Sequence, residues 1–564
     1  MAKWQEKLNP DETFLWQDYQ NALDYQARTG LRNKIPSFVD FYEGRQWPLP
    51  TESTKNLPRP VVNIIKMICR SKKGAILSTP VKVLYKSFSP YTDVERFNDF
   101  ATCLFKEIGQ DDLDRCGIDD AIKKGSCFFH YYWDSAAVSS VDGEEGSVRC
   151  ELIDPLNIFF ANPCEYNEQK QDWIIISSRK ELSKICALAD RDLKISDLVS
   201  DELDDTYNVD SPSLLGKATL LTRYFKQNGE VWCERATKTH IISKPFRIVP
   251  ELDDEEINSF GKKRGIYPHK FSMSQLHSSE LYPIACGYYE RKEGSIYGLG
   301  EVEGLIPNQK AINFNIAMSL LNAQQCAWGK YIALPNALNG QKISNVPGQI
   351  LIDYSGTGEG IKKLPELELS RVPMELVSTL NDLTRSVSGA SEVMTGEAYA
   401  STLSGAAIAY LQAQAQVPIE ELKNNFWSLK KKQGLILAQF LKNYFWKRKY
   451  LRKLRDESGK QYEEIDDFYS YDYQNSLFEV TVEAVGGTKA SIASDISLLD
   501  SCLKNGKISL ETYIRAYPES AITNKEEILK QIEAEKRSEI EILRKEIANL
   551  KENSNQKSAN TGEV

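Results

Sequence analysis

The side chains that most often bind metals or carry out catalysis are sparse in this sequence. Its four histidines form no HExxH motif, and none lies at zinc-binding spacing from a cysteine. Adjacent acids such as Asp466 and Asp467 could hold a divalent cation for a nuclease, but such pairs more often lie on solvated loops. We therefore expect no catalytic residues, no metal site and no cofactor.

Nucleotide and acyl-transfer chemistry also lack their usual motifs. The chain has no GxxxxGKS/T sequence, and the glycine cluster at Gly298, Gly300 and Gly304 does not fit GxGxxG. A second cluster at 356–360 fits neither pattern, and there is no GxSxG nucleophile elbow. These absences argue against an ATP-driven motor and against a serine hydrolase.

The composition is that of an ordinary globular protein. A chain of 564 residues is too long for one core, so we expect several domains. The 11 cysteines include no CxxC pair, which is typical of reduced thiols in a cytoplasmic setting. We expect neither a signal peptide nor a membrane span, because the longest notable uncharged run, 311–329, contains several Asn and Gln residues.

The net charge of −9 also bears on function. A protein that grips duplex DNA usually carries a basic excess, because the release of counterions from phosphate dominates its affinity. An acidic chain is better suited to letting DNA slide past than to holding it.

The most distinctive stretch is a small, nearly uncharged loop at about 391–403 between two helix-compatible segments. Apolar residues recur at steps of three and four before the loop, at Val372, Leu376, Leu380, Leu383 and Val387. The segment after the loop continues to about 444, and Pro418 should kink or restart its helix. The loop has no His, Cys or Lys, so it suggests a mechanical part and not a catalytic one.

Other segments have clear periodicity. Residues 301–328 are predicted to be helical, with Pro307 tolerated in the first turn. Residues 81–85, 174–177 and 478–484 have the β-branched or alternating pattern of strands.

Four groups of fragments around this loop resemble the portal proteins of tailed double-stranded DNA bacteriophages. They occur in the family's order and span most of the chain. They are FYEGRQW with LPRPVVN (41–47, 57–63), IDPLNIFFANP with QDWII (153–163, 171–175), YGLGEVE with LIPNQ (297–303, 305–309), and SDI, GKIS and YP (494–496, 506–509, 517–518).

The resemblance implies an α+β portal-type fold. It would have an α+β wing, a two-helix stem, a small αβ clip, a tunnel loop followed by a long helix, and a mainly helical crown. The boundaries that we assign are 1–300 for the N-terminal part of the wing, 301–329 for the first stem helix, 330–365 for the clip, 366–390 for the second stem helix, 391–403 for the tunnel loop, 404–490 for the long kinked helix and the C-terminal part of the wing, 491–552 for the crown and 553–564 for a disordered tail.

The resemblance also implies a function without catalysis. Copies of the chain would form a ring, of twelve subunits, at one vertex of the capsid, and DNA would pass through it in packaging and ejection without sequence preference. The implied partners are the large terminase, the head–tail adaptor, and the major capsid and scaffolding proteins, but no membrane. The protein would be assembled in the host bacterial cytoplasm and retained in the virion.

Three groups of residues are candidates for contact with DNA or with neighbouring subunits. The tunnel-loop group is Thr395, Gly396, Glu397, Ala398, Tyr399, Ala400, Ser401 and Thr402. The stem group consists of amides that could face the channel or neighbouring helices: Asn313, Asn315, Gln324 and Gln325. The basic group is Lys430, Lys431, Lys432, Lys447, Arg448, Lys449, Arg452 and Lys453.

The basic group has two interpretations. It lies within 430–455, a segment with ten basic residues and no acid, and an acidic run follows at 456–472. The segment could contact DNA phosphate or the capsid, or it could pair with the acids. Complementary charge so close in the sequence favours pairing.

Two other functional classes remain open. A non-channel head–tail adaptor or scaffold would form a ring or polymer without a DNA-sized pore. A DNA-processing enzyme would show metal- or ATP-dependent turnover. The order of wing, stem, clip, stem and loop favours a portal protein over both.

Overall fold

The computed structural model describes most of the chain, in two compact units. The described residues are 13–87, 92–138, 143–190, 193–198, 200, 216–248, 281–327, 331–335, 337–342, 352–354, 356, 359–363, 372–389, 405–445, 447–455, 461–473, 476–484, 489–517 and scattered positions between 528 and 547. The first unit comprises Met1–Leu77, Val81–Leu403 and Gln414–Glu483, and the second comprises Ser78–Pro80, Ser404–Ala413 and Ala484–Val564. Helices and sheets are mixed in the α+β manner that the sequence predicted.

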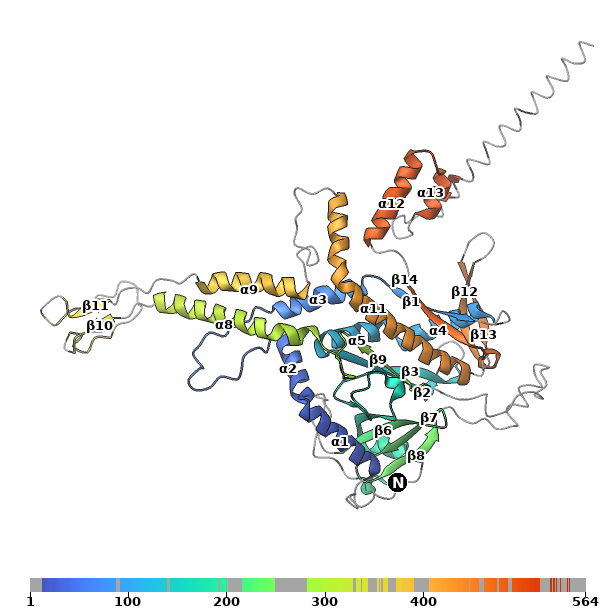
Figure 1. The fold of residues 1–564 in the computed structure, drawn as a ribbon, viewed down its shortest axis with the longest axis horizontal. Helices are drawn as coiled ribbons and strands as arrows, with labels where there is room; N and C mark the ends of the chain where they lie inside the picture. The colour runs from blue at the N-terminus through green and yellow to red at the C-terminus, as the bar shows by residue number, and fades with distance from the viewer. Residues whose placement is uncertain are drawn as a thin grey trace, which may run out of the picture. The chain divides into compact units, whose positions relative to one another are not determined.

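Three amphipathic helices open the first unit: α1 (Phe14–Arg28), α2 (Leu31–Glu43) and α3 (Ile64–Leu77) (Figure 1). Their apolar residues recur at helical spacing, so each helix buries one face. Trp16 and Tyr19 of α1 pack in a cluster with residues of the five-stranded sheet described below. Helices α2 and α3 contribute instead to the main core.

A three-stranded antiparallel sheet follows α4 (Val94–Ile108) and α5 (Gln110–Lys124). Its order is β3 (Glu145–Ile153), β2 (Ser126–Val138) and β9 (Ile284–Tyr288). Helix α5 packs closely on this sheet at Gly117, where a Cβ atom would lie 2.3 Å from the ring of Phe129. The absence of a side chain at Gly117 therefore sets how near α5 can approach β2.

A five-stranded antiparallel sheet runs in chain order from β4 to β8. Its strands are β4 (Ile158–Phe160), β5 (Trp173–Glu181), β6 (Lys217–Gln227), β7 (Glu230–Ala236) and β8 (Ile241–Arg247). The connection between β6 and β7 is Asn228 and Gly229, both with positive φ, which is the backbone of a tight hairpin turn. Short helical segments lie beside this sheet at α6 (Leu182–Ala187), η2 (Glu168–Lys170) and η3 (Ile195–Asp197).

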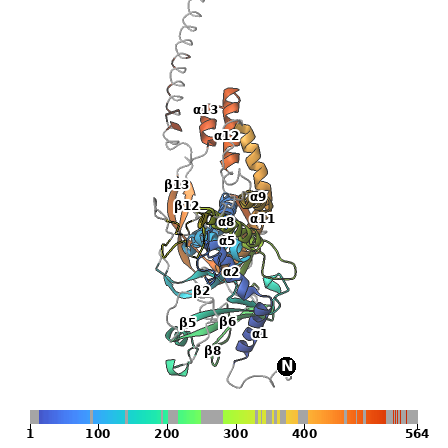
Figure 2. The ribbon, with the colours of Figure 1, turned by 90° about the vertical axis from the view of Figure 1, so that its left-hand side faces the viewer.

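Two helices lie side by side where the sequence predicted the stem: α8 (Glu301–Ala327) and α9 (Val372–Ser388) (Figures 1 and 2). The segment between them contains β10 (Tyr331–Ala333), which pairs antiparallel with β11 (Ile361–Lys363).

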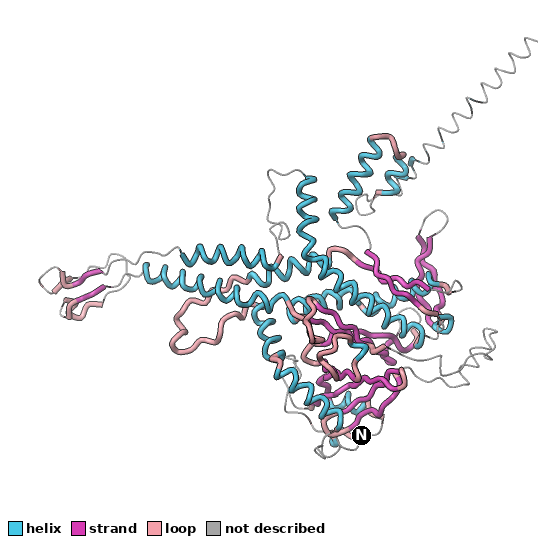
Figure 3. The backbone as a smooth tube through the Cα atoms, in the orientation of Figure 1, coloured by secondary structure: helices cyan, strands magenta, loops and turns pink. Residues whose placement is uncertain are grey.

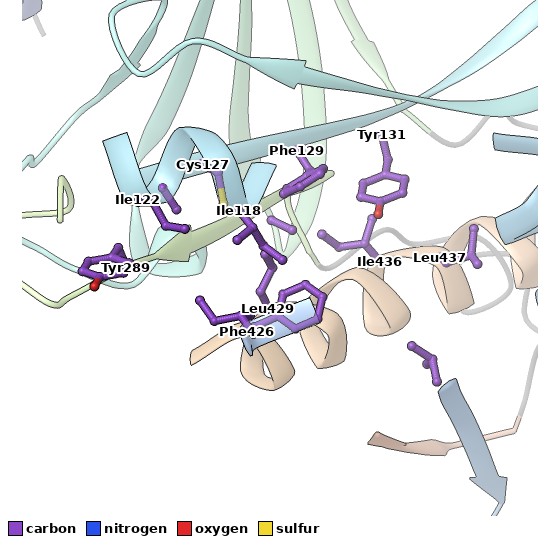
Figure 4. Close-up of a cluster of buried hydrophobic side chains, with 14 of the residues drawn as sticks. Ile118, Ile122, Cys127, Phe129, Tyr131, Tyr289, Phe426, Leu429, Ile436 and Leu437 are labelled. Carbon is purple, nitrogen blue, oxygen red and sulfur yellow. The ribbon is translucent and has the colours of Figure 1, made fainter. Parts of the chain in front are cut away.

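The long helix α11 (Gly405–Asn443) passes through the main core. Figure 4 shows Phe426, Leu429 and Ile436 of α11 facing side chains of α5 and β2. The helix includes Pro418 without a break, so of the two alternatives predicted at this residue, a kink or a restart, the restart does not occur. Helix α11 also approaches two further segments closely at Gly434, where a Cβ atom would lie 2.7 Å from Val83 and 2.8 Å from Val480.

Two strand pairs follow α11 in the first unit. Strand β12 (Arg448–Arg455) pairs with β13 (Gln461–Phe468), and β14 (Phe478–Ala484) pairs with β1 (Val81–Ser87). The 3-10 helix η5 (Ser470–Tyr473) lies between them in sequence. Stacked rings hold these elements to α4, with 4.1 Å between the centroids of Phe100 and Phe468.

The second unit contains α12 (Lys489–Lys504) and α13 (Leu510–Ala516). Ser509 caps α13 by accepting from the Thr512 amide, and Tyr513 donates to Asp500 of α12. The elements described in the region predicted to form the crown are thus helical, and the tail at 553–564 lies outside the described residues.

Candidate functional site

The base of the stem is fixed by a buried ion pair. Lys72 of α3 lies 2.8 Å from Glu301, the first residue of α8, and the two side chains are only 8% and 11% exposed. Tyr289 donates to Glu301 at 2.6 Å and accepts from Lys72 at 3.0 Å. Burial, and then the negative charge of Glu301, raises the pKa of Tyr289 far above its usual value, so the phenol remains a donor.

The glycines before α8 serve close backbone packing. A Cβ atom at Gly298 would lie 2.5 Å from the carbonyl oxygen of Gly125 and 2.7 Å from that of Glu290. The Gly298 amide donates to Ser126 at 2.7 Å. Gly298 and Gly300, whose cluster does not fit the GxGxxG pattern, therefore let the chain pass close to the end of α5.

Amides of α8 cap the start of α3. The side-chain oxygen of Gln309 accepts from the backbone amides of Ile64 and Ile65 at 3.0 and 3.4 Å, and its nitrogen donates to the Val62 carbonyl at 2.7 Å. The first amides of a helix have no partner within the helix, so these bonds satisfy groups that would otherwise be unpaired. The segment before α3 is thereby held on α8.

Asn313 is part of this cap and does not face outward, as the sequence had suggested that it could. It is 3% exposed, accepts from the Val62 amide at 3.3 Å and donates to Gln46 at 2.6 Å. Its position four residues after Gln309 places both amides on one face of α8. That spacing was the signal in the sequence for a shared role, but Val62, the partner just before α3, is 251 residues away.

The other stem candidates differ from Asn313. Asn315 is half-buried and donates to the Ala311 carbonyl of its own helix at 2.8 Å. Gln324 is exposed near the end of α8, and the side chain of Gln325 lies outside the described residues. Of these candidates, Gln324 has the most accessible described side chain.

Two of the basic candidates on α11 have buried or half-buried acidic partners. Lys430 pairs with Asp114 of α5, and their side chains are 7% and 3% exposed. Asp114 also accepts from the amide of Gln433 at 2.9 Å. Lys432 lies 2.9 Å from Glu168, whereas Lys431 is exposed. Lys430 and Lys432 are thus used within the subunit.

The basic candidates after α11 also contact their own chain. Arg448 is 6% exposed and donates to the Glu145 carbonyl at 2.6 Å. Arg452 donates to Asp99 at 2.9 Å and lies 3.6 Å from Asp466 of the acidic run. These contacts leave little of either guanidinium for a phosphate.

The remaining basic candidates lie near or on β12. Lys447 is 3.7 Å from Asp467, and Lys449 is opposite Asp467 in the register of β12 and β13. Lys453 is opposite Glu463, but its side chain lies outside the described residues. The geometry at Arg452 and Lys447 thus matches the pairing interpretation, while Lys430 and Lys432 pair with acids far away in the sequence.

The residues predicted to form the tunnel loop, 391–403, lie outside the described residues. The end of α9 can still be placed. Gly389 follows it with φ +71°, and a Cβ atom there would lie 3.2 Å from Pro418 of α11. The chain therefore leaves α9 against α11, the helix to which it returns.

Large apolar side chains are exposed along both stem helices. On α9 they include Val372 at 68%, Leu383 at 54% and Val387 at 81% exposed. On α8 they include Phe314 at 58% and Met318 at 44%. By contrast, the described residues contain no group of acids, histidines and cysteines placed to hold a metal.

The sequence model of the phage P22-like portal protein family matches residues 16–487, well over half of the chain. The chain belongs to this family. A comparison with curated proteins found no match. The match includes both stem helices, α11 and every contact described above.

The portal subunit is thus a bacteriophage virion protein of the capsid vertex, as the resemblance predicted. Within its described part, no helix is both long and apolar enough to cross a bilayer. The sequence analysis did not single out Lys72, Glu301 or Asp114, since none belongs to a local pattern that marks burial.

Proposed function

We propose that twelve copies of this portal subunit form a closed ring whose axial channel carries DNA during packaging and ejection. The exposed apolar side chains of α8 and α9 are the observation that supports the ring. An isolated subunit would leave Phe314, Val372 and Val387 in water. Burying such side chains is worth about 1.5–3 kcal/mol each, so a neighbouring stem would stabilise the subunit.

The channel acts through geometry and weak contact. Cyclic symmetry repeats each subunit's loop at 391–403 around one axis, where Thr395–Thr402 would be nearest to the DNA. Twelve chains carry a formal charge of 12 × −9 = −108, which disfavours a tight grip on phosphate. DNA can then move past the ring without sequence-specific contact.

The described residues suggest no catalytic role for the ring. Their buried acids are paired with basic groups, as Asp114 is with Lys430 and Glu301 with Lys72. The segment between α8 and α9, with β10 and β11, is the clip in this proposal. It would dock the large terminase during packaging and then the head–tail adaptor, while the wing would contact the major capsid and scaffolding proteins in the host cytoplasm.

Native mass spectrometry of the purified chain, with images of the same sample, tests the proposal. A closed ring near 12 × 64.0 = 768 kDa with a hole wide enough for duplex DNA is the expected result. A particle without a pore would contradict the channel, and ATP- or metal-dependent DNA cleavage would contradict a role without catalysis.

A further inference from the structure

The segment between α2 and α3 forms an ordered loop beside the stem, which we call the 47–62 loop (Figures 1 and 3). The indole of Trp47 closes it by donating to the Pro60 carbonyl at 2.8 Å. Arg59 crosses its interior and donates to the Pro48 carbonyl at 2.7 Å and to Thr54 at 3.1 Å. The loop therefore has a defined shape, although it contains no helix or strand.

The 47–62 loop exposes several apolar side chains. Leu49 is 89% exposed, Leu57 is 46% exposed and Val62 is 47% exposed. Single exposed leucines are ordinary on a protein surface. A loop that is ordered by internal hydrogen bonds and still presents several apolar side chains has the character of a docking element.

The 47–62 loop and α9 contact different faces of α8. Asn308 donates to Thr384 of α9 at 3.1 Å. The loop side is marked by Asn313, which bonds Gln46 and Val62, and by Phe314, which shares a recess with Trp47 and Pro48. At 100° per residue, positions 313 and 314 lie about 140° and 240° around the helix from Asn308. The stem thus has the loop on one side of α8 and α9 on the other.

Helix α9 carries an uncovered apolar strip. Its members recur at steps of four, seven and four residues, which places them on one face. The α9 strip is Val372, Leu376, Leu383 and Val387, at 68%, 44%, 54% and 81% exposed. Thr384 and Ser388, which are buried, lie on the neighbouring face.

The two surfaces also have opposite charge. The 47–62 loop contains Lys55, Arg59 and Glu52, a net charge of 2 − 1 = +1. Helix α9 contains Glu375, Asp382 and Arg385, a net charge of 1 − 2 = −1, and Glu375 and Asp382 are exposed. The loop, with a net charge of +1, and helix α9, with a net charge of −1, are electrostatically complementary, whereas two loops or two α9 helices would not be.

We propose that the 47–62 loop of one subunit docks on the α9 strip of the next subunit. The inference rests on the proposed ring, and it names two surfaces that meet within it. In a cyclic ring each subunit must present two different, complementary surfaces to its two neighbours. The loop and the strip satisfy this condition because the loop lies beside α8, the strip lies on α9, and the two differ in shape and charge.

A photo-cross-linking residue, p-benzoylphenylalanine, in place of Leu49 of the full-length chain tests the contact. Illumination of the assembled ring should give covalent dimers and higher species in denaturing gels. Peptide mapping should join position 49 of one chain to residues 372–388 of another. The same photo-residue in place of Glu52, a polar position of the same loop, shows whether cross-linking to α9 is specific to position 49.

Charge substitutions provide a second, independent readout. L49D and L376D should each lower the fraction of assembled ring at least tenfold at a fixed concentration, while E52Q leaves it unchanged. Circular dichroism of each variant checks that the subunit still folds. Because both variants disrupt one contact, combining them should add little to either loss.

The outcomes separate the docking from the ring itself. A ring in which position 49 cross-links only within its own chain, or to a region other than α9, overturns the docking and leaves the ring intact. Unchanged assembly of L49D also overturns it. A wild-type chain that stays monomeric at every concentration contradicts both the ring and the docking.

Discussion

In the isolated subunit, the base of the stem is buried, whereas the outward face of its two helices, which we call the outer stem, is exposed. At the base, Lys72 and Glu301 are buried and paired, and in the core of the same unit Lys430 and Asp114 are buried and paired as well. On the exposed face of the stem, Val372 and Val387 of α9 are 68% and 81% exposed. The base is therefore complete within one chain, whereas the outer stem is incomplete.

This difference separates stability from assembly. Buried charges cost several kcal/mol unless they are paired, so the subunit must supply both partners for the base to fold. An exposed apolar side chain destabilises a subunit far less than an unpaired buried charge, so it can remain exposed until a neighbouring subunit covers it. We infer that the base sets the stability of the subunit and that the outer stem sets the stability of the ring.

The largest expected effect comes from breaking a buried ion pair. Lys430→Ala leaves Asp114 buried without its counter-charge and should lower the free energy of unfolding by about 3–5 kcal/mol. Urea denaturation of the full chain measures the loss. Lys431→Ala, which changes an exposed lysine on the same helix, is the control and should change little. Equal stability of the two variants would argue that the buried pair does not support the fold.

The outer stem should respond in the reverse way. Leu383→Asp should leave the free energy of unfolding of the subunit within about 0.5 kcal/mol of wild type. It should weaken each subunit contact by about 2 kcal/mol, or roughly 30-fold, because a buried leucine becomes charged. Native mass spectrometry against concentration measures the ring fraction. Ser378→Asp adds the same charge to a different face of α9, and a matching loss in that control would remove the assignment to the strip.

A smaller effect is expected where α11 approaches β1 and β14. Gly434→Ala places a methyl group 2.7 Å from Val83 and 2.8 Å from Val480 and should cost about 1–3 kcal/mol. Gly304→Ala, in α8, meets nothing within 4 Å and should gain up to about 1 kcal/mol from helix propensity. Thermal unfolding of the pair gives the comparison, and a stabilised Gly434→Ala would show that the contact can open without cost.

The smallest expected effect is on the pH dependence of stability. Burial alone would raise the pKa of Asp119, but the hydrogen bonds and charges of Lys123 and Lys73 outweigh it and hold that pKa below 3.8. Such a group stabilises the fold above the unfolded pKa and loses that contribution as pH falls through the folded pKa. Asp119→Asn should therefore lose less than about 1 kcal/mol near neutral pH and nothing in strong acid. Denaturation at several pH values measures this, with exposed Asp111→Asn as the control.

Much of the framework could be predicted because it depends on local periodicity. The three-four spacing before 391 corresponds to α9, and the alternation at 478–484 corresponds to β14. Helix α11 ends at Asn443, next to the predicted end at 444. Of the kink or restart predicted at Pro418, the restart does not occur, because one lost helix bond matters little when Ile419 and Phe426 of the same helix are buried in the core.

The partners of polar side chains could not be predicted in the same way. The sequence around Asn313 is equally compatible with an amide that faces a channel and with one that binds the segment before α3. Lys430 sits in a basic run that looked like a surface, yet its partner Asp114 is more than 300 residues away. Such pairings depend on tertiary contacts, which periodicity does not encode.

Hydroxyl-radical footprinting of the assembled ring and of the dissociated subunit tests the central claim most directly. Our account predicts that oxidation of Phe314 and Leu383, exposed by 58% and 54% in the isolated chain, falls at least fivefold in the ring. Oxidation of Tyr166, which is 48% exposed and lies away from the stem, should change much less. Equal oxidation of the stem residues in both states would contradict a ring built on the outer stem.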